Sequence, residues 1–295
     1  MMIVKISENE KRFIKQGYNG PWICSTKVEL LPLLLCYNHT MDVTKTNSAA
    51  WDKEVEKNNW WTRIVDESKI KNAKNGDPEI WVTPTKDIPL SWAKPLKGKK
   101  VLNACGGGGQ QTPILASYGA AVTVIDISPN QLRQDRLALE HFNLEGEIVE
   151  GSVLSLPFED NSFDHIINPC SLNFIEDLGQ VYSEFHRVQK KGGSLIFGIS
   201  NPILYIFDDK KIEKNLKVKY TLPFSDTKSL SKRELEKRIK KGDTIEFSHT
   251  LSSIISDLLS KGFIIDGFYS DYSGFEPLDS FVRDSYLAFK AIKVF

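Results

Sequence analysis

The sequence predicts an α/β protein with a mostly parallel central sheet that ends in an antiparallel strand. From Lys100 onward, short apolar runs alternate with helix-like stretches, a pattern typical of β-α-β units. A glycine-rich turn at residues 106–109 follows the first of these runs. Near the C-terminus, the apolar runs 263–269 and 286–294 have no helix between them, which indicates an antiparallel end to the sheet.

The composition is that of an ordinary globular protein. The 295 residues suffice for one large domain with an appendage, and 41% of them are hydrophobic. The 38 basic and 38 acidic residues balance, whereas nucleic acids and membrane surfaces usually select a positive field. We therefore expect a cytoplasmic protein, a monomer or homodimer, that binds neither nucleic acid nor membrane.

The domain organisation is predicted from changes in this rhythm. We expect an N-terminal extension over 1–45 and one domain over 46–295. Within the domain we expect a cap over 46–98, a ligand-binding core over 99–200, an insertion or lid over 201–248, and a C-terminal helix with antiparallel strands over 249–295. The run Leu30–Cys36 is too short for a membrane span, which needs about 20 residues. An alternative is that translation begins at Met41, which would leave 1–40 as an extension.

Individual elements follow from local signals. Ser128 and Pro129 open a helix that we expect to reach about His141, because serine is a good N-cap and proline fits the first turn. Further helices are predicted over 178–188, where the cations and glycines of 190–193 would stop the helix, and over 251–261. The predicted strands are 100–104, 121–125, 147–149, 163–167, 194–199, 263–269 and 286–294.

Two further segments are informative. The lysine-rich stretch 208–241 mixes both charge signs at helical spacing, so we interpret it as a solvated helix pair, with a lid or a nucleic-acid patch as alternatives. All six tryptophans precede the sheet, so this aromatic segment should pack on the open face of the domain and roof a ligand pocket, with simple core packing as the equal alternative for any single tryptophan. They are Trp22, Trp51, Trp60, Trp61, Trp81 and Trp92.

The glycine-rich turn restricts the ligand class. Glycine allows positive φ and lets a ligand touch the backbone. A phosphate-binding P-loop needs lysine where this chain has Gln110 and Gln111, and a dinucleotide motif needs a third glycine where it has Gln111 or Thr112. A third class of ligand for such a turn carries a methionine tail, a ribose and an adenine but no phosphate. Asp126, at the end of the second strand, is suitably placed to bind its ribose hydroxyls.

Residues 101–198 resemble the core of class I S-adenosylmethionine-dependent methyltransferases, and 47–293 resemble the bacterial small-molecule members. The matching pieces are the glycine turn, Val124–Ser128, Gly151–Val153 leading to Leu156–Phe158, Ser162–Asp164, and Arg187–Val188 through Gly192–Gly193. The resemblance implies a Rossmann-like doubly wound sheet with a reversed last strand. It also implies that S-adenosylmethionine is the cofactor and that its methyl group passes to a small molecule by in-line displacement.

The resemblance also implies site residues. The methionine moiety would lie against 105–109, the ribose on Asp126, and the adenine between Ile127 and Val153. The full cofactor set is Asn103, Cys105, Gly106, Gly107, Gly109, Gln110, Asp126, Ile127, Ser152, Val153 and Asn168. The substrate pocket would take Trp51, Trp60, Ser171 and Tyr205. Three positions depart from the family pattern. Asn103 and Ser152 occupy positions where the family usually has an acid, and Cys105 occupies the position of the first glycine.

Catalytic groups are harder to assign. His249 precedes the last predicted helix and resembles a position that faces the substrate pocket, so it is a candidate general base, with a helix-cap neighbour as the equal alternative. His165 lies in a strand and is interpreted as a core residue. The four cysteines are scattered without a C-x-x-C pair, so we expect no metal site. Cys170 lacks a readable histidine partner and is interpreted as inert.

Two alternatives to methylation of a small molecule stay open. The departures at Asn103 and Cys105 are compatible with a regulatory protein that binds the cofactor without transferring methyl groups. A nucleic-acid methyltransferase would use the lysine-rich stretch, and Asn168-Pro169 matches the first two positions of the motif of amino-group methyltransferases. The two positions after Pro169 are Cys170 and Ser171, which do not match that motif, and the neutral net charge also disfavours it.

Overall fold

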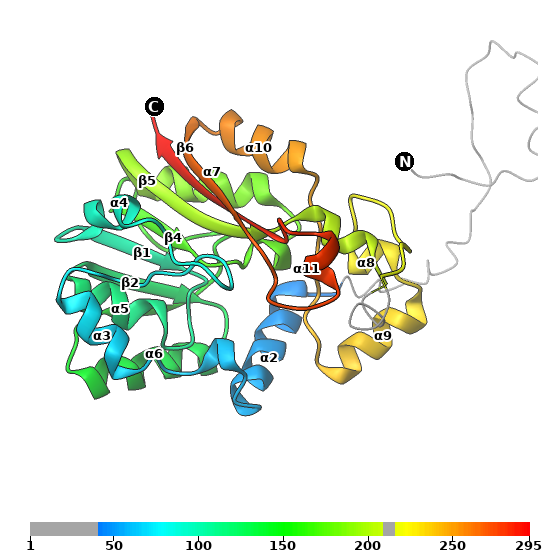
Figure 1. The fold of residues 1–295 in the computed structure, drawn as a ribbon, viewed down its shortest axis with the longest axis horizontal. Coiled ribbons are helices and arrows are strands. Elements are labelled where there is room, and N and C mark those ends of the chain that lie inside the picture. The colour runs from blue at the N-terminus through cyan, green and yellow to red at the C-terminus, as the bar shows by residue number, and fades with distance from the viewer. Residues whose placement is uncertain (1–40, 209–215) are drawn as a thin grey trace, which may run out of the picture. The chain divides into compact units, whose positions relative to one another are not determined.

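The computed structural model describes residues 41–208 and 216–295, which belong to the compact unit Met41–Phe295 (Figure 1). The expectations for Trp22, Cys24 and the run Leu30–Cys36 lie outside the described residues. One seven-stranded sheet, in the order β3-β2-β1-β4-β5-β7-β6, organises this unit. None of the helices in the described ranges is both long and apolar enough to cross a bilayer.

The sheet has the predicted directions. The strands β3, β2, β1, β4 and β5 run parallel, and β7 is antiparallel to both β5 and β6. The α/β fold with a mostly parallel sheet and an antiparallel end is therefore confirmed. The strands are β1 (Lys100–Ala104), β2 (Ala121–Asp126), β3 (Glu147–Glu150), β4 (Phe163–Asn168), β5 (Gln189–Ser200), β6 (Phe263–Asp271) and β7 (Tyr286–Lys293).

Helices cover both faces of the sheet (Figure 1). One core cluster lies under α7 and α10, and a second lies under α3, α4 and α5. The larger helices are α2 (Val43–Glu56), α3 (Glu67–Lys74), α5 (Gln111–Tyr118), α6 (Pro129–Phe142), α7 (Leu178–Val188), α9 (Lys232–Lys241) and α10 (Leu251–Ser260). The short ones are α4 (Leu90–Ala93), α8 (Asp226–Ser229) and α11 (Leu278–Phe281).

One local expectation is wrong. The helix over 178–188 ends where predicted, but residues 190–193 do not cap it, because β5 begins immediately at Gln189. Gln189 is already extended (φ −83°, ψ 138°) and pairs with Phe163, and the register shifts before the next pair, His165 with Ser194. Gly192, at φ +78°, belongs to this irregular stretch of the strand. The glycines therefore serve a bulge in β5.

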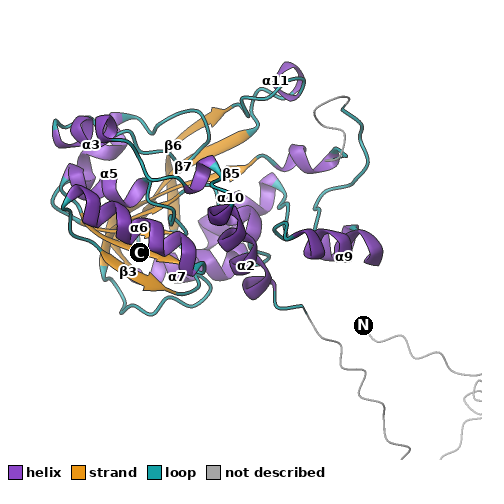
Figure 2. Cartoon of the chain, turned by 90° about the horizontal axis from the view of Figure 1, so that it is seen from below, coloured by secondary structure: helices purple, strands orange, loops and turns teal. Residues whose placement is uncertain are grey.

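The lysine-rich stretch contains the helices α8 and α9 in its described part. Helix α9 has no buried residue and opens with a capping box between Ser231 and Glu234, as suits a solvated helix. Figure 2 shows α9 at the periphery, away from the sheet.

The order of the strands fixes where a ligand can bind. After β1 the chain passes to β2 and β3 on one side of β1, and it then crosses over to β4 on the other side. In open α/β sheets the loops then separate at the carboxyl ends of the strands and leave a crevice. Both the glycine turn after β1 and Asp126 at the end of β2 lie at this edge.

Candidate active site

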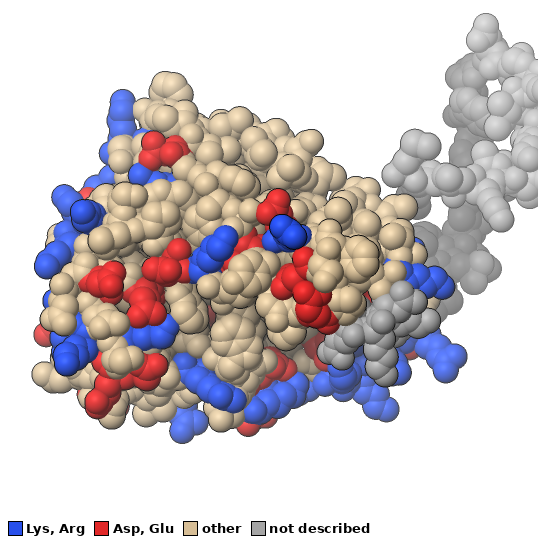
Figure 3. Space-filling view, in the orientation of Figure 1, with Lys and Arg blue, Asp and Glu red and all other residues tan. Residues whose placement is uncertain are grey.

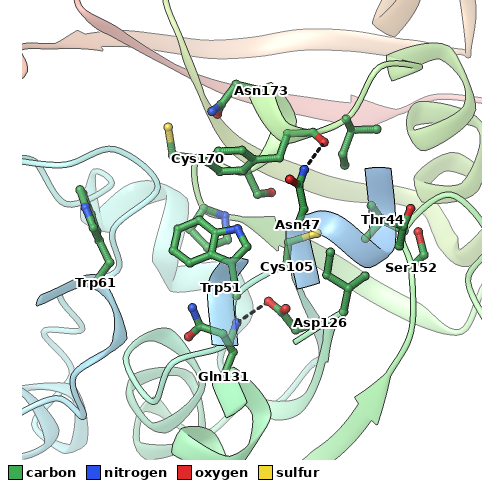
Figure 4. A pocket seen from close by; sticks show the side chains of 18 of the residues that line it. Thr44, Asn47, Trp51, Trp61, Cys105, Asp126, Gln131, Ser152, Cys170 and Asn173 are labelled. Carbon is green, nitrogen blue, oxygen red and sulfur yellow. Dashed lines mark hydrogen bonds between the residues drawn. The ribbon is translucent and has the colours of Figure 1, made fainter. Parts of the chain in front are cut away.

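A cavity of about 530 Å³ opens at this edge of the sheet (Figure 4). The glycine turn and the end of β2 form its base, and α2, residues 81–84 and the segment 169–177 form its other walls. Its volume lies within the ~300–1,000 Å³ typical of small-molecule sites. The two core clusters of the sheet support this base from behind.

The glycine turn has no room for side chains. A Cβ on Gly106 would lie 1.9 Å from Asn103 Oδ1, and one on Gly107 would lie 2.7 Å from the Cβ of Gln131. Gly108 and Gly109 have φ values of +110° and +77°, which glycine adopts without strain. The turn can therefore take this course only as a run of glycines.

Cys105 occupies the first position of the turn in a strained conformation. Its φ is +53°, in the left-handed region that favours glycine. Burial raises the pKa of its thiol to about 12, and the same holds for Cys170 across the cavity. Neither cysteine is therefore a thiolate nucleophile near neutral pH.

Asp126 is tied to the turn through its backbone contacts. Its Oδ2 accepts the N–H of Gly107 at 3.2 Å, and its Oδ1 accepts the N–H of Ser128 at 2.9 Å. Burial is the largest influence on this carboxyl group and raises its pKa to about 6. Because Asp126 also lines the cavity, it offers a buried carboxylate to a ligand there.

A second carboxylate, which the sequence reasoning missed, supports the turn from α6. Asp135 accepts the N–H of Gly108 at 3.0 Å and that of Gly109 at 3.2 Å, and it is fully buried. Burial raises its pKa to about 7. The available signal is weak: Asp135 follows Gln131, which lines the cavity, by one helical turn.

Asn103 lies behind the turn rather than in the cavity lining. Its Nδ2 donates to the carbonyl oxygen of Gly106 and to Thr112 Oγ1, each at 3.0 Å. Its buried Oδ1 has no hydrogen-bond partner among the described residues. The side chain therefore braces the turn and retains one acceptor beside Gly106.

Helix α2 roofs the cavity and is pinned by polar contacts. Asn47, 1% exposed, donates through Nδ2 to the carbonyl oxygens of Phe174 (3.2 Å) and Ile245 (3.0 Å) and accepts the Ile245 N–H at 2.7 Å. One turn further on, Asp52 accepts hydrogen bonds from Ser128 Oγ and the Asn130 N–H.

The described tryptophans divide between the cavity, the surface and the core, where Trp92 lies. Trp51 points into the cavity from α2 and packs edge-on against Phe174, with centroids 5.4 Å apart (Figure 4). Trp61 and Trp81 also line the cavity. Trp60 is 41% exposed and stacks on the outside of Trp61, so the structure does not bring this predicted residue into the pocket.

The structure brings most of the predicted ligand residues together. The cavity lining includes Cys105, Gly106, Gly107, Gln110, Asp126, Ile127, Ser152, Val153, Trp51 and Ser171. The lining does not include Asn103, Gly109 and Asn168, which lie behind the residues that face the cavity. The carbonyl oxygen of Gly109 accepts the Val65 N–H, and the Gly109 N–H donates to Asp135 Oδ1. Asn168 Nδ2 donates to the carbonyl oxygen of Ala104 and to Ser171 Oγ.

Tyr205 and His249 also stand apart from this cavity. Tyr205 lines an adjoining cavity of about 200 Å³ and donates to Glu246 Oε2 at 2.8 Å. His249 is absent from the lining; its Nε2 donates to the carbonyl oxygen of Ile175 at 2.9 Å, and burial lowers its pKa. That geometry fits the helix-neighbour interpretation better than a base. His165 pairs with Ser194 in the sheet.

The described residues contain no group of three or more His, Cys, Asp or Glu side chains that could hold a metal ion. The charged groups in the lining are all carboxylates: Asp42, Asp126, Glu176 and Asp177.

Comparisons with known proteins agree with this architecture. Residues 102–197 match the model of a family described as "Methyltransferase domain". The chain is 43% identical over 250 residues to the uncharacterized methyltransferase YbaJ of Bacillus subtilis (strain 168), covering 84% of this chain and 97% of that protein.

Two further matches are more distant. A demethylmenaquinone methyltransferase of Staphylococcus haemolyticus is 33% identical over 144 residues, which are 47% of this chain and 59% of that protein. A crystal structure of an S-adenosylmethionine-dependent methyltransferase from Mesorhizobium loti superposes with a TM-score of 0.52 at 18% identity, over 67% of this chain and 92% of that one. At that identity the superposition shows a common fold.

Proposed function

Because the chain belongs to the class I S-adenosylmethionine-dependent methyltransferases, we propose that it methylates a small-molecule acceptor bound beside Trp51. One observation carries the choice of acceptor. The cavity does not end at the glycine turn and Asp126, but continues past Trp51 to Cys170 and Asn173 (Figure 4). This further part is a roofed pocket, which suits a small acceptor.

The residues present fit the cofactor. The glycine turn is a cradle that side chains would fill, and Asp126 offers a carboxylate suited to a ribose diol. Helix α5 has no side-chain cap at its N-cap residue Gln110, so the N–H groups of its first turn suit the cofactor's carboxylate. Ile127 and Val153 supply an apolar slot for adenine, with Ser152 beside it.

When bound, S-adenosylmethionine supplies a methyl group already activated by its sulfonium. The protein then mainly has to align the acceptor and exclude water, and orientation alone can contribute about 7–11 kcal/mol. Trp51 and Phe174 close the cavity from above, and Asn47 holds their elements together. Among the described lining residues there is no histidine or lysine to serve as a base, so a proton lost by the acceptor would pass to water or a lining carboxylate.

A nucleic-acid substrate has less support. Figure 3 shows basic and acidic side chains interspersed on the face drawn, and α9 pairs several of its charges internally or with neighbours. Nucleic-acid binding usually needs a basic patch to neutralise phosphates.

The cofactor site is tested with S-adenosylhomocysteine. We expect this ligand to raise the melting temperature by several degrees at saturation, because it binds only the folded chain. Asp126→Ala removes the carboxylate and should raise the Kd at least ~10-fold by calorimetry. Asp87→Ala, at an exposed carboxylate outside the cavity, is the matched control and should leave the Kd unchanged.

Two results would contradict the proposal. If neither S-adenosylmethionine nor S-adenosylhomocysteine shifts the melting temperature of the wild-type chain, the proposed cofactor site is wrong. Tight cofactor binding with no methylated product from a broad metabolite pool would instead favour the regulatory, non-catalytic alternative.

A further inference from the structure

A second cavity, of about 200 Å³, adjoins the main one at the carboxyl end of β5. Ser200 and Tyr286 line both cavities, and they are paired across β5 and β7. An apolar cavity of about 150 Å³ is large enough to bind benzene, so the second cavity has room for a ring-sized group. The two cavities can therefore hold two parts of one molecule.

Aromatic side chains form much of the wall of the second cavity. The ring of Phe224 contacts those of Tyr205 and Tyr220, with centroids 5.7 and 4.8 Å apart. Apolar side chains complete this part of the wall, and they are Leu204, Phe207 and Leu230. All of these residues come from the insertion between β5 and α10. Such a wall suits an apolar ring, because the removal of apolar surface from water favours binding.

The charged groups of the second cavity are balanced by one another. Arg238 lies 3.0 Å from carboxylate oxygens of both Asp226 and Glu246. Glu246 also accepts the hydroxyl of Tyr205 at 2.8 Å. A charged group on a ligand would have to break these contacts or enter without a counter-charge, and burying an unpaired charge is strongly unfavourable. An uncharged group therefore fits this cavity better.

Backbone hydrogen bonds hold the walls of the two cavities in one frame. The N–H of Phe247 donates to the carbonyl oxygen of Asn173, in the wall of the main cavity, at 2.7 Å. The N–H of Ser248 donates to the carbonyl oxygen of Phe224, in the wall of the second cavity, at 2.8 Å. Because consecutive residues make these two bonds, the two walls are fixed relative to each other.

Tyr286 offers a hydroxyl to a ligand where the two cavities meet. No hydrogen bond joins this hydroxyl to a residue in the ranges 41–208 and 216–295, and it is not among the enclosed polar atoms that lack a partner. A ligand can therefore reach it. Burial raises the pKa of the phenol, so near neutral pH the group stays protonated and can both donate and accept a hydrogen bond.

From these observations we propose that the methyl acceptor is an elongated molecule that occupies both cavities. Its methyl-accepting part lies beside Trp51, and an uncharged, ring-sized apolar group fills the second cavity. A polar atom between these two parts bonds to the hydroxyl of Tyr286. The inference rests on the function proposed above and deepens it, because it names the shape and polarity of the acceptor. Tyr205, which the sequence predicted in the substrate pocket, then contacts the second part of the acceptor.

The test compares probes with one ring and with two. Phenol, aniline and thiophenol serve as heads, because the inference does not specify the acceptor atom, and each is compared with its para-benzyloxy derivative. Calorimetry on the full chain saturated with S-adenosylhomocysteine measures each Kd. We expect at least one benzyloxy derivative to bind ~10-fold tighter than its parent, because its second ring is removed from water. The absence of such a gain for all three heads overturns the inference.

A variant that fills the second cavity locates the second ring. Leu230→Trp should reduce the gain from the benzyloxy group to less than ~2-fold and leave the Kd of S-adenosylhomocysteine unchanged. Leu204→Phe fills the same cavity from another part of the wall and should have the same effect, should Leu230→Trp not fold. Leu259→Trp, at an exposed leucine outside both cavities, is the matched control and should keep the full gain. A full gain in the cavity-filling variants would show that the ring binds elsewhere.

Tyr286→Phe tests the contact between the cavities, because it removes only the hydroxyl. It should weaken binding of the benzyloxy derivative ~5-fold and leave unchanged the binding of the para-phenethyl analogue, in which a methylene replaces the ether oxygen. Tyr272→Phe, at an exposed tyrosine outside both cavities, is the control and should change neither. Equal losses for the two probes, or no loss for either, would overturn the contact with Tyr286.

Failure of this inference can be told apart from failure of the proposed function. If S-adenosylhomocysteine binds the wild-type chain but the second ring adds no affinity, the elongated acceptor alone is overturned. If S-adenosylhomocysteine does not bind, the proposed function is overturned and this inference with it.

Discussion

Two buried carboxylates with different neighbours support the glycine turn. Asp126 bonds to Gly107 from the end of β2, and Asp135 bonds to Gly108 and Gly109 from α6. Asn103, on β1, contributes a neutral amide that donates to the Gly106 carbonyl oxygen. The carboxyl groups behind this turn therefore come from β2 and α6, and their protonation should affect the stability of the fold.

We predict that stability falls as the pH rises from about 4 to 7, in part because of Asp135. Its pKa is raised from 3.8 to about 7 on folding, so in that range the folded chain holds a proton that the unfolded chain has released. Raising the pH then favours the unfolded state, by up to ~4 kcal/mol for a three-unit shift. Asp135→Asn should flatten this slope in urea unfolding measured between pH 4.5 and pH 8.

Asp126, with a pKa of about 6, should leave a residual slope of the same sign in that variant. Asp87→Asn, at an exposed carboxylate, should retain the full wild-type slope. A slope unchanged by Asp135→Asn would show that this carboxyl group does not hold the extra proton.

Individual residues were predictable where a strand end placed them. Asp126 follows a buried strand directly, so its position at the ligand edge could be read from the pattern. Asp135 could not, because helical periodicity does not say which turn of α6 meets the glycine loop. The sequence did not show that Trp61, and not the predicted Trp60, lines the cavity. The two lie in a 3-10 helix (Trp60–Thr62), where neighbouring side chains point in different directions.

Secondary structure elements were predicted best where two signals agreed. The helix α6 begins at the predicted Ser128 cap, and β1 and α7 have the predicted bounds. The stop signal at 190–193 failed because sequence alone does not show that Phe163 and Gln189 pair across the sheet. Cations with glycines suit a helix end and a bulge equally well.

Helix α2 should behave as a roof whose closure depends on Asn47. Asn47→Ala removes three hydrogen bonds and leaves buried backbone groups of Phe174 and Ile245 without partners. We expect a loss of about 2–4 kcal/mol in unfolding free energy, because each unsatisfied buried group costs about 1–3 kcal/mol. Hydrogen exchange over 43–56 should also become faster, and the Kd for S-adenosylhomocysteine should rise.

Lys45→Ala, on the exposed side of the same helix, is the control and should change neither exchange nor affinity. Wild-type exchange rates in Asn47→Ala would mean that α2 is held by its apolar packing and by Asp52 instead.

At the scale of the whole molecule, the described unit Met41–Phe295 contains both core clusters, the full sheet and the cavity. The sheet type was predictable because the family resemblance and the alternating pattern both implied a mostly parallel sheet with an antiparallel end. The acceptor was not, because the far wall of the cavity is assembled from α2 and residues 81–84, 169–177, 200 and 286, which no local pattern links.

We therefore predict that a chain beginning at Met41 folds and binds S-adenosylhomocysteine with a Kd within about threefold of the full chain. The B. subtilis relative supports this, because 250 aligned residues make up 97% of its length. Calorimetry and thermal unfolding of the two chains measure the difference. A truncation that removes residues through Thr46 is the contrasting variant, because it deletes the Asp42 cap and the first turn of α2. That variant should lose affinity, and an equal loss on removing only 1–40 would place part of the site in the N-terminal segment.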